Sequence, residues 1–282
     1  MDSLQYIPGQ KRPTQDHLAE YLQHHTSSLK QKTADIGDWQ RALQAQGKQS
    51  LLVIFQAMDA AGKDSTIRKV FYKCDPAGYG VTSFKAPSKI ERAHDFMWRC
   101  YPHFPRRGYL QIFNRSYYEE TLIVRVHPEF LKGQGIDKKP TQKFWQQRFK
   151  YINQVEKQLK RNGTRVIKFF LDVSQPQQHY RFISRYATPE KQWKFNVGDL
   201  KESAHWGAYQ AAFDDMLSHT STKHAPWYVI PADDKDMMRN AVAGIIQQHL
   251  ANMKPQYPTL PVYSEEDLKL IDQLMSSYQQ PD

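Results

Sequence analysis

The chain has 282 residues, of which 40% are hydrophobic and 13% aromatic, a composition that excludes a disordered chain and allows one large α/β domain or two small ones. The formal net charge of +10 and the isoelectric point near 9.4 favour a polyanionic partner such as nucleic acid, a membrane surface or a phosphate polymer. A generally basic surface without such a partner is the plainer alternative.

The chain begins with a segment that we expect to form an N-terminal helical arm, residues 1–50. Residues 1–25 are polar and should be extended or partly helical. Residues 26–46 place apolar side chains at helical spacing, although Gly37 lowers the helix propensity there. This segment lacks an apolar signal core, and no apolar run in the chain reaches membrane-spanning length. The two cysteines, Cys74 and Cys100, do not have metal-ligand spacing and are too few for a disulfide framework. Together with the missing signal core and membrane-spanning run, this predicts a cytoplasmic protein with no membrane contact.

Residues 51–72 carry the most informative pattern. Residues 51–55 are a continuous apolar run, as in a strand buried on both faces of a sheet, and residues 65–72 read as a helix. The turn between them ends in Gly-Lys, which is the context of a phosphate-binding loop. Backbone N–H groups and the helix N-terminus attract an anion, and Lys63 adds a full positive charge. We assign phosphate binding here to Ala60, Ala61, Gly62, Lys63, Asp64 and Ser65.

This loop departs from the common pattern of Gly, four residues, Gly-Lys and Ser or Thr. Ala57 stands at the first Gly, and Asp64 stands at the hydroxyl position. Asp59 adds a second carboxylate, which would repel a phosphate unless divalent cations lie between them. We therefore expect Asp59 and Asp64 to bind a metal. The alternative is an ordinary strand-to-helix turn in which Asp64 caps the helix.

The remaining chain alternates strands with helices. Strands are predicted at 81–85, 109–113, 164–172 and 227–231, with helices at 90–99 and 141–161 and a helical or irregular piece at 121–126. This alternation predicts an α/β fold with a five-stranded parallel sheet and helices on both faces. We expect one domain at residues 51–253 with a lid at about 180–202, followed by a C-terminal tail at 254–282. Ligands bind at the carboxyl ends of the strands in such sheets.

Two further segments carry candidate site residues. Asn114, Arg115 and Glu119 follow the strand at 109–113, where Arg115 could clamp phosphates and Glu119 could pair with Arg115 or with a metal. The alternative for Arg115 is a structural ion pair at a strand end. The predicted lid is basic and interrupted by Pro189 and Gly198, which suits a segment that closes over phosphates and excludes water. The alternative is a solvated helix; the basic residues are Arg181, Arg185, Lys191 and Lys194.

Taken together, the motifs resemble those of the second polyphosphate kinase family, the P-loop kinases that move phosphoryl groups between inorganic polyphosphate and nucleotides. The matching stretches run in family order and include MDAAGKDSTIRKV (58–70), GVTSFKAPS (80–88), IFNRSYYEETLIVRVH (112–127), PEKQWKF (189–195) and STKHAPWYVIPADDK (221–235). The residues VTSFKAP and NRS within the second and third of these stretches resemble the branch that phosphorylates nucleoside mono- and diphosphates. The chain departs from the family pattern at Ser65, where Gly is usual, and at Tyr117, where this branch often has His.

The resemblance implies a thymidylate-kinase-like P-loop kinase fold with a helical lid, and a requirement for Mg²⁺ or Mn²⁺. It implies that Asp59, Lys63 and Arg115 are catalytic. Arg115 would also hold phosphates of the acceptor nucleotide, with Asn114 and Glu119 beside it. Arg181 and Arg185 would be the lid arginines, with Lys191 and Lys194 as further lid charges. The implied partners are inorganic polyphosphate and nucleoside mono- and diphosphates. We expect a homo-oligomer, for which the arm and the tail are candidate contacts.

Two other functions remain open from the sequence. The first is an ATP-dependent nucleotide kinase of the same fold, against which Asp64 and the basic lid speak. The second is a non-enzymatic protein that binds polyanions or nucleic acid. Such a protein would need no paired carboxylates beside the phosphate-binding loop, so we expect no nucleic-acid partner.

Overall fold

A five-stranded parallel sheet forms the centre of the protein, in a computed structural model that describes residues 3–278. The strand order is β2-β3-β1-β4-β5, with β1 in the middle. The predicted α/β architecture with five parallel strands is therefore confirmed. The strands are β1 (Ser50–Gln56), β2 (Tyr79–Ser83), β3 (Leu110–Asn114), β4 (Thr164–Asp172) and β5 (Trp227–Pro231).

The central strand explains why its sequence is apolar without alternation. In β1, Val53 lies opposite Ile112 of β3 on one side and Ile167 of β4 on the other. Every residue of β1 is buried, because helices cover both faces of the sheet. Burying one such aliphatic side chain contributes roughly 1.5–3 kcal/mol. Apolar residues are therefore favoured on both faces of the strand.

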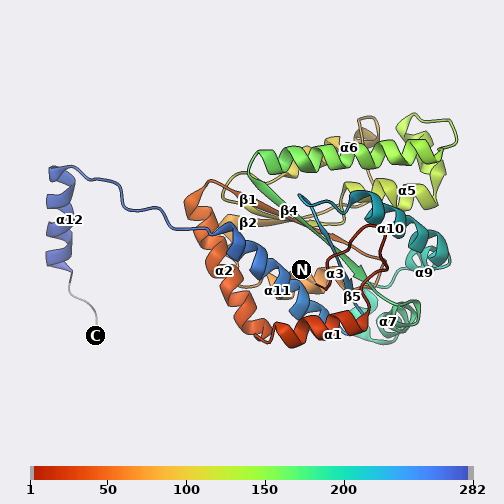
Figure 1. Cartoon of the computed structure of the whole chain (residues 1–282), viewed down its shortest axis with the longest axis horizontal. Coiled ribbons are helices and arrows are strands. Elements are labelled where there is room, and N and C mark those ends of the chain that lie inside the picture. The colour runs from red at the N-terminus through yellow and green to blue at the C-terminus, as the bar shows by residue number, and fades with distance from the viewer. Residues whose placement is uncertain (1–2, 279–282) are drawn as a thin grey trace.

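Helices cover the two faces of the sheet in separate layers (Figure 1). On one face lie α5 (Ile123–Val126), α6 (Gln142–Arg161) and α10 (Trp206–Thr220). On the other lie α2 (Leu29–Gln46), α3 (Lys63–Val70) and α11 (Lys235–Met253), with α1 (Gln15–His24) at the edge. The long predicted helix at 141–161 is confirmed as α6. Among residues 3–278, no helix combines the length and apolarity needed to cross a membrane.

The N-terminal segment packs into the same core as the sheet. Leu4, Leu18 and Ile36 belong to the buried apolar cluster that includes the strands. Tyr6 N donates to the Trp227 carbonyl (2.9 Å), which places this segment beside β5. A Cβ on Gly37 would lie 2.6 Å from the Lys73 carbonyl oxygen, so α2 needs glycine there for close packing despite its low helix propensity.

The helix predicted at 90–99 is wrong. The structure has a short helix α4 (Lys89–Arg92) and a 3₁₀-helix at Trp98–His103, separated by a turn. Within the turn, the Asp95 carboxylate accepts a hydrogen bond from Met97 N (2.9 Å). Such local side-chain bonds compete with helical hydrogen bonds and favour turns. The other 3₁₀-helices span Pro76–Gly78, Tyr117–Thr121 and Pro128–Gln134.

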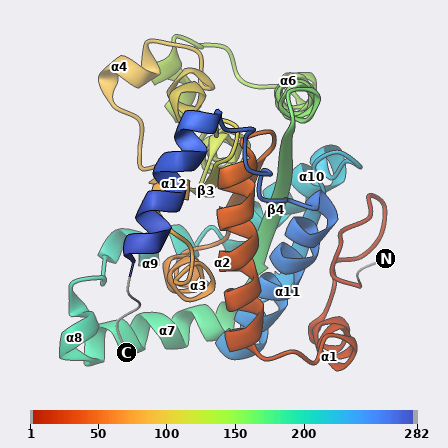
Figure 2. The same ribbon diagram turned by 90° about the vertical axis from the view of Figure 1, so that its left-hand side faces the viewer.

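The last described helix, α12 (Glu265–Ser277), stands apart from the body of the protein (Figure 1). Figure 2 views the molecule from the side on which α12 lies, so the helix is in front of the body there. An extended connector leads to it from the end of α11, and every residue of α12 is exposed. It lies at the opposite end of the molecule from α7 (Gln175–Ala187) and α9 (Val197–Ser203) (Figure 1). The predicted tail therefore contains a helix whose described residues are all exposed.

Candidate active site

A pocket of about 1,230 Å³ lies at the carboxyl ends of β1 and β3, between the loop after β1 and helix α7. The loop spans residues 57–62 and turns sharply into α3. Ala60 has φ of +62° and Gly62 has φ of +108°, which L side chains rarely adopt. Around Gly62 a Cβ would find ordinary contacts at 3.6 Å, so the backbone conformation, and not space, favours glycine there.

Lys63 is the first residue of α3, and its ammonium group is held against the loop. Its Nζ donates to the carbonyls of Ala57 (2.9 Å) and Met58 (3.4 Å). Burial lowers the pKa of Lys63 to about 8; the Arg115 charge acts in the same direction, and Asp59 opposes it. Lysine has three N–H donors, so one remains for an anion in the pocket.

Arg115 follows β3 and faces the loop from the opposite side. Its guanidinium forms an ion pair with Asp59 and lies 3.5 Å from Glu119. The Glu119 charge raises the pKa of Arg115, and Asp59 adds to this effect. Arg115 has φ of +63°, a conformation that costs about 1–3 kcal/mol in a residue other than glycine. Asp59 therefore reaches Arg115 directly, a pairing that the sequence did not predict.

Asp64 and Asn114 form a second polar pair across the pocket. Asn114 Nδ2 donates to Asp64 Oδ1 at 2.8 Å. The end of β3 therefore contacts two carboxylates, Asp64 at the start of α3 through Asn114 and Asp59 of the loop through Arg115. This contact gives a physical reason for an amide, and not a carboxylate, at position 114, because a second carboxylate there would repel Asp64.

Asp59 and Asp64 have the chemistry of magnesium ligands, and both line the pocket. Mg²⁺ prefers oxygen ligands and is usually held by one or two carboxylates, water and substrate phosphates. Within residues 3–278 no group of three His, Cys, Asp or Glu side chains could hold a metal ion by itself. The residues fit a metal that arrives with phosphates and do not form a closed metal site.

The lid consists of α7, a short helix α8 (Pro189–Gln192) and α9. Arg185 of α7 lies 3.3 Å from the Asp199 carboxylate of α9. Lys191 donates to Ser184 Oγ (3.3 Å), and Lys194 lies 4.7 Å from the centre of the Trp193 ring. Arg185, Lys191 and Lys194 all line the pocket. The lid thus places positive charge at the pocket, and two short non-helical segments connect its three helices.

Arg181 has a different environment from the other lid cations. It is buried, and its guanidinium donates to four carbonyl oxygens: Ala60 and Ala61 of the loop (both 3.0 Å), Ala232 (2.7 Å) and Asp233 (2.8 Å). Carbonyl acceptors thereby occupy most of its donors. Arg181 ties the phosphate-binding loop to the end of β5, a role that sequence reasoning missed.

The pocket brings together every predicted site residue except Glu119, which lies beside Arg115 and lines a small adjoining cavity. It also contains three basic residues that sequence reasoning did not assign, namely Arg68, Lys85 and Lys235. Lys85 and Lys235 fall inside the motifs at 80–88 and 221–235, so their position near strand ends was an available signal. Asp172, another strand-end carboxylate, pairs with Arg12 (3.3 Å) and does not line the pocket.

The parallel sheet, the phosphate-binding loop and the basic lid define a P-loop kinase of the α/β class. Residues 21–258 match the family described as Polyphosphate kinase 2, and the chain belongs to this family. An ADP-polyphosphate phosphotransferase of Rhodopseudomonas palustris is 42% identical over 269 residues, which cover 94% of this chain and 93% of that protein.

A second relative and a solved structure extend the comparison. An AMP/ADP-polyphosphate phosphotransferase of Meiothermus ruber is 42% identical over 228 residues, which cover 80% of this chain and 81% of that protein. The crystal structure of polyphosphate kinase 2 from Arthrobacter aurescens TC1 aligns with a TM-score of 0.83 at 30% identity. That alignment covers 96% of this chain and 95% of the crystal structure's chain. The expected family and fold are thereby confirmed.

Proposed function

We propose that this protein transfers a phosphoryl group from inorganic polyphosphate to AMP or ADP, forming ADP or ATP, in a reaction that is reversible in principle. One observation carries the proposal: a single pocket joins a phosphate-binding loop, two carboxylates and a set of basic side chains from the lid and strand ends. The names of the relatives, which refer to AMP, ADP and polyphosphate, support the choice of substrates. Other nucleoside mono- and diphosphates are possible acceptors.

In the proposed reaction, a terminal phosphate oxygen of the acceptor attacks the terminal phosphorus of polyphosphate. The bond from that phosphorus to the next bridging oxygen breaks, so polyphosphate loses one phosphate and the acceptor gains one. The attacking oxygen is already ionised, so the reaction needs positioning and charge neutralisation more than a strong base. Lys63 and the loop N–H groups of residues 60–64 would hold the transferred group. Arg115, with Asn114 and Glu119 beside it, would hold the acceptor.

Mg²⁺ or Mn²⁺ is proposed as the cofactor, with Asp59 and Asp64 as the side chains that hold it beside the phosphates. When bound, the ion neutralises phosphate charge that two carboxylates would otherwise repel. Asp59 also keeps Arg115 in place, so its carboxylate would serve both cations. Arg185, Lys191 and Lys194 would cover the phosphates from the lid and limit access of water.

The direct test is to incubate the protein with Mg²⁺, polyphosphate of several chain lengths, and AMP or ADP, and to measure ADP and ATP by chromatography. We expect nucleotide products that disappear when the metal is chelated. Replacing polyphosphate with ATP separates the rival nucleotide kinase, which would phosphorylate AMP from ATP alone. Binding of polyphosphate with no nucleotide product at any chain length would support a non-enzymatic polyanion-binding protein and contradict the proposal.

We also propose that nucleic acid and membranes are not partners and that the protein is cytoplasmic. The pocket's cations alternate with carboxylates such as Asp59, Asp64 and Asp199, which suits metal-bridged phosphates better than a bare nucleic-acid backbone. Filter binding with single-stranded DNA, against polyphosphate at the same salt concentration, tests the first point. Cell fractionation tests the location.

A homo-oligomer assembled through α12 is the last part of the proposal. Residues 254–282 contain five acidic residues and two lysines, whereas the whole chain carries a net charge of +10. This contrast favours docking of the acidic helix on the basic body of a second copy. The helix also exposes apolar side chains that a partner would cover, among them Leu268, Leu270, Leu274 and Met275.

Light scattering of the full chain tests this assembly. We expect an oligomer that dissociates in the double variant Leu270→Asp and Leu274→Asp, while Gln273→Asp on the same helix retains the assembly. A monomeric wild-type protein, or an unchanged mass in the double variant, would contradict a role for α12.

A further inference from the structure

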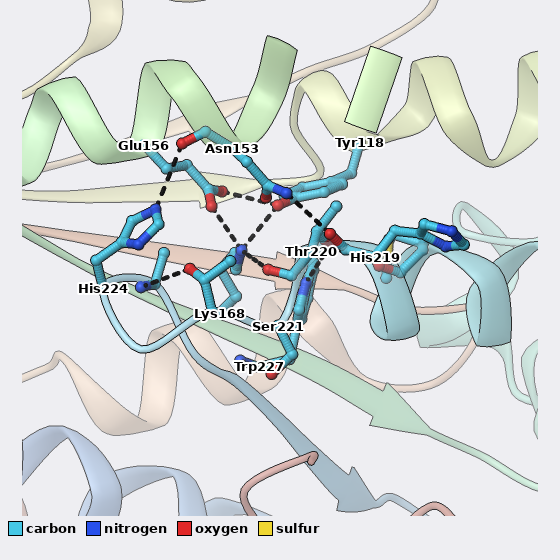
Figure 3. Close-up of polar contacts among 12 residues, drawn as sticks. Tyr118, Asn153, Glu156, Lys168, His219, Thr220, Ser221, His224 and Trp227 are labelled. Carbon is cyan, nitrogen blue, oxygen red and sulfur yellow. Dashed lines mark hydrogen bonds and ion pairs between the residues drawn. The ribbon is translucent and has the colours of Figure 1, made fainter. Parts of the chain in front are cut away.

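A buried polar cluster lies between β4, α6 and the start of β5 (Figure 3). Lys168 of β4 and Glu156 of α6 are fully buried and form an ion pair at 2.7 Å. Lys168 Nζ also donates to the Tyr118 hydroxyl (2.8 Å) and the Thr220 carbonyl (2.9 Å). The ammonium group therefore has three acceptors for its three donors. None of these residues lines the pocket of the active site.

Two adjacent tyrosines complete the cluster. The hydroxyls of Tyr117 and Tyr118 both donate to Glu156 Oε1, at 2.9 and 2.8 Å. One carboxylate oxygen of Glu156 thus accepts hydrogen bonds from both hydroxyls, and the other accepts one from the Lys168 ammonium group. Both tyrosines are buried, and burial together with Glu156 raises their pKa values, so the hydroxyls stay protonated donors.

Such a cluster needs an explanation beyond stability. Replacing a buried ion pair with apolar residues of similar volume is often neutral or stabilising, whereas a pair that fixes one arrangement of the chain has a structural use. Here Lys168 of β4 and Glu156 of α6 are joined to two consecutive tyrosines, Tyr117 and Tyr118. The tyrosines belong to a third element, the 3₁₀-helix Tyr117–Thr121. The cluster therefore specifies the position of the segment that contains Tyr117 and Tyr118.

That segment starts at Arg115. Arg115 has φ of +63° and its N–H donates to the Phe55 carbonyl of β1 (3.0 Å). Ser116, between Arg115 and the tyrosines, is buried and its hydroxyl accepts from Tyr118 N (3.2 Å). The chain is thus held by β1 on one side of the Arg115 turn and by Glu156 on the other. A residue other than glycine keeps a positive φ only where the surrounding structure holds it in that conformation.

We propose that Lys168 and Glu156 are positioning residues for the acceptor side of the active site, acting through the hydroxyls of Tyr117 and Tyr118. With those hydroxyls anchored, Arg115 and Glu119 leave the turn in fixed directions, toward Asp59 and toward each other. The inference rests on the proposed function in one respect, which is that Arg115 contacts the acceptor nucleotide. The polyphosphate side, with Lys63 and the lid, does not depend on the cluster.

The test removes the hydroxyls and leaves the apolar volume and the ion pair in place, in the double variant Tyr117→Phe and Tyr118→Phe. We expect kcat/KM for AMP to fall about 100-fold, because small misplacements of a positioning group have effects of this size. The KM for polyphosphate should stay unchanged. Hydrogen exchange of the amides at 114–119 should accelerate in the free variant.

Tyr228→Phe is the matched control, because the Tyr228 hydroxyl bonds to His249 Nε2 (2.8 Å) in another part of the core. It should lower the melting temperature without changing the KM for AMP or exchange at 114–119. If the double variant does not fold, Tyr117→Phe alone gives the same readouts, since Tyr118 then still bonds to Lys168.

The outcomes separate this inference from the proposed function. A wild-type protein that makes no ADP or ATP from polyphosphate refutes the proposed function, and the exchange measurement then still decides whether the cluster holds the Arg115 turn. An active wild-type protein whose double variant matches Tyr228→Phe in KM for AMP and in exchange refutes the positioning role.

Discussion

Lys63 and Lys168 are both buried lysines whose pKa burial lowers to about 8, yet they lie in opposite environments. Lys168 has a carboxylate, a hydroxyl and a carbonyl around it and does not line the pocket of the active site. Lys63 has two carbonyls and lines a pocket of about 1,230 Å³. A buried charge whose donors are all satisfied holds the structure together, whereas one with a donor to spare can bind a ligand.

The arginines of the site divide in the same way. Carbonyls accept from four of the five N–H donors of Arg181, which ties the loop to β5. Arg185 has one carboxylate partner, Asp199, at 3.3 Å and keeps other donors toward the pocket. Residue type alone therefore does not indicate how many N–H donors a cation keeps for a ligand, whereas the number of its protein acceptors does.

The largest expected effect is on activity in Lys63→Met. Loss of one preorganised cation from a phosphoryl-transfer site should lower kcat/KM for polyphosphate by about 100- to 1,000-fold. Steady-state kinetics with AMP as acceptor gives the value. Lys69→Met on the exposed face of the same helix is the matched control and should retain activity.

Arg181→Lys should act on the structure first. Lysine cannot reach four carbonyls, so buried acceptors lose their donors at a cost of about 1–3 kcal/mol in the free energy of unfolding. Urea denaturation measures this loss. We expect kcat to fall with it, because the loop at Ala60 and Ala61 loses its anchor. Full stability in the variant would show that the four hydrogen bonds contribute nothing.

Arg185→Ala should affect binding without this loss of stability. The residue is partly exposed and paired with a carboxylate, so its removal should raise the KM for polyphosphate by about tenfold, equivalent to about 1.4 kcal/mol. The difference from wild type should shrink at high salt. A variant that loses stability as Arg181→Lys does, with an unchanged KM, would place Arg185 among the structural cations.

The smallest effect is on pH dependence. Lys63 is protonated below its pKa of about 8, so kcat/KM for polyphosphate should fall as pH rises through that value. The groups that face Lys63 are Arg115, Asp59, Glu119 and Asp64. Lys63→Arg should move this decline to higher pH, because arginine stays charged. A pH profile that is identical in Lys63→Arg would exclude Lys63 as its source.

The sequence was sufficient to predict the elements with strong local patterns. The apolar run at 51–55, the Gly62-Lys63 turn and the periodicity of α6 each determine structure within a short window. The Asp95 turn was missed because one side-chain hydrogen bond overrides a helical pattern. The four carbonyls around Arg181 come from distant positions in the chain, so no spacing in the sequence reveals them.

The site was predictable to the same extent. Strand ends identified Asp59, Asn114 and Arg115, because parallel strands bring their carboxyl ends to one edge. The pairing of Asp59 with Arg115, and of Asp64 with Asn114, depends on side-chain geometry across two strands. The link from Lys168 to the Arg115 turn is further removed, since it needs three elements packed in register.

The measurement that most directly tests the contrast between the two lysines is urea unfolding of Lys63→Met and Lys168→Met at pH 7. Lys168→Met leaves Glu156 buried and unpaired and should lose about 3–5 kcal/mol. Lys63→Met leaves two carbonyls without this donor, at a cost of about 1–3 kcal/mol that is offset in part because a buried charge is removed, so it should lose less than Lys168→Met. Equal losses in the two variants, or a larger loss in Lys63→Met, would contradict the account.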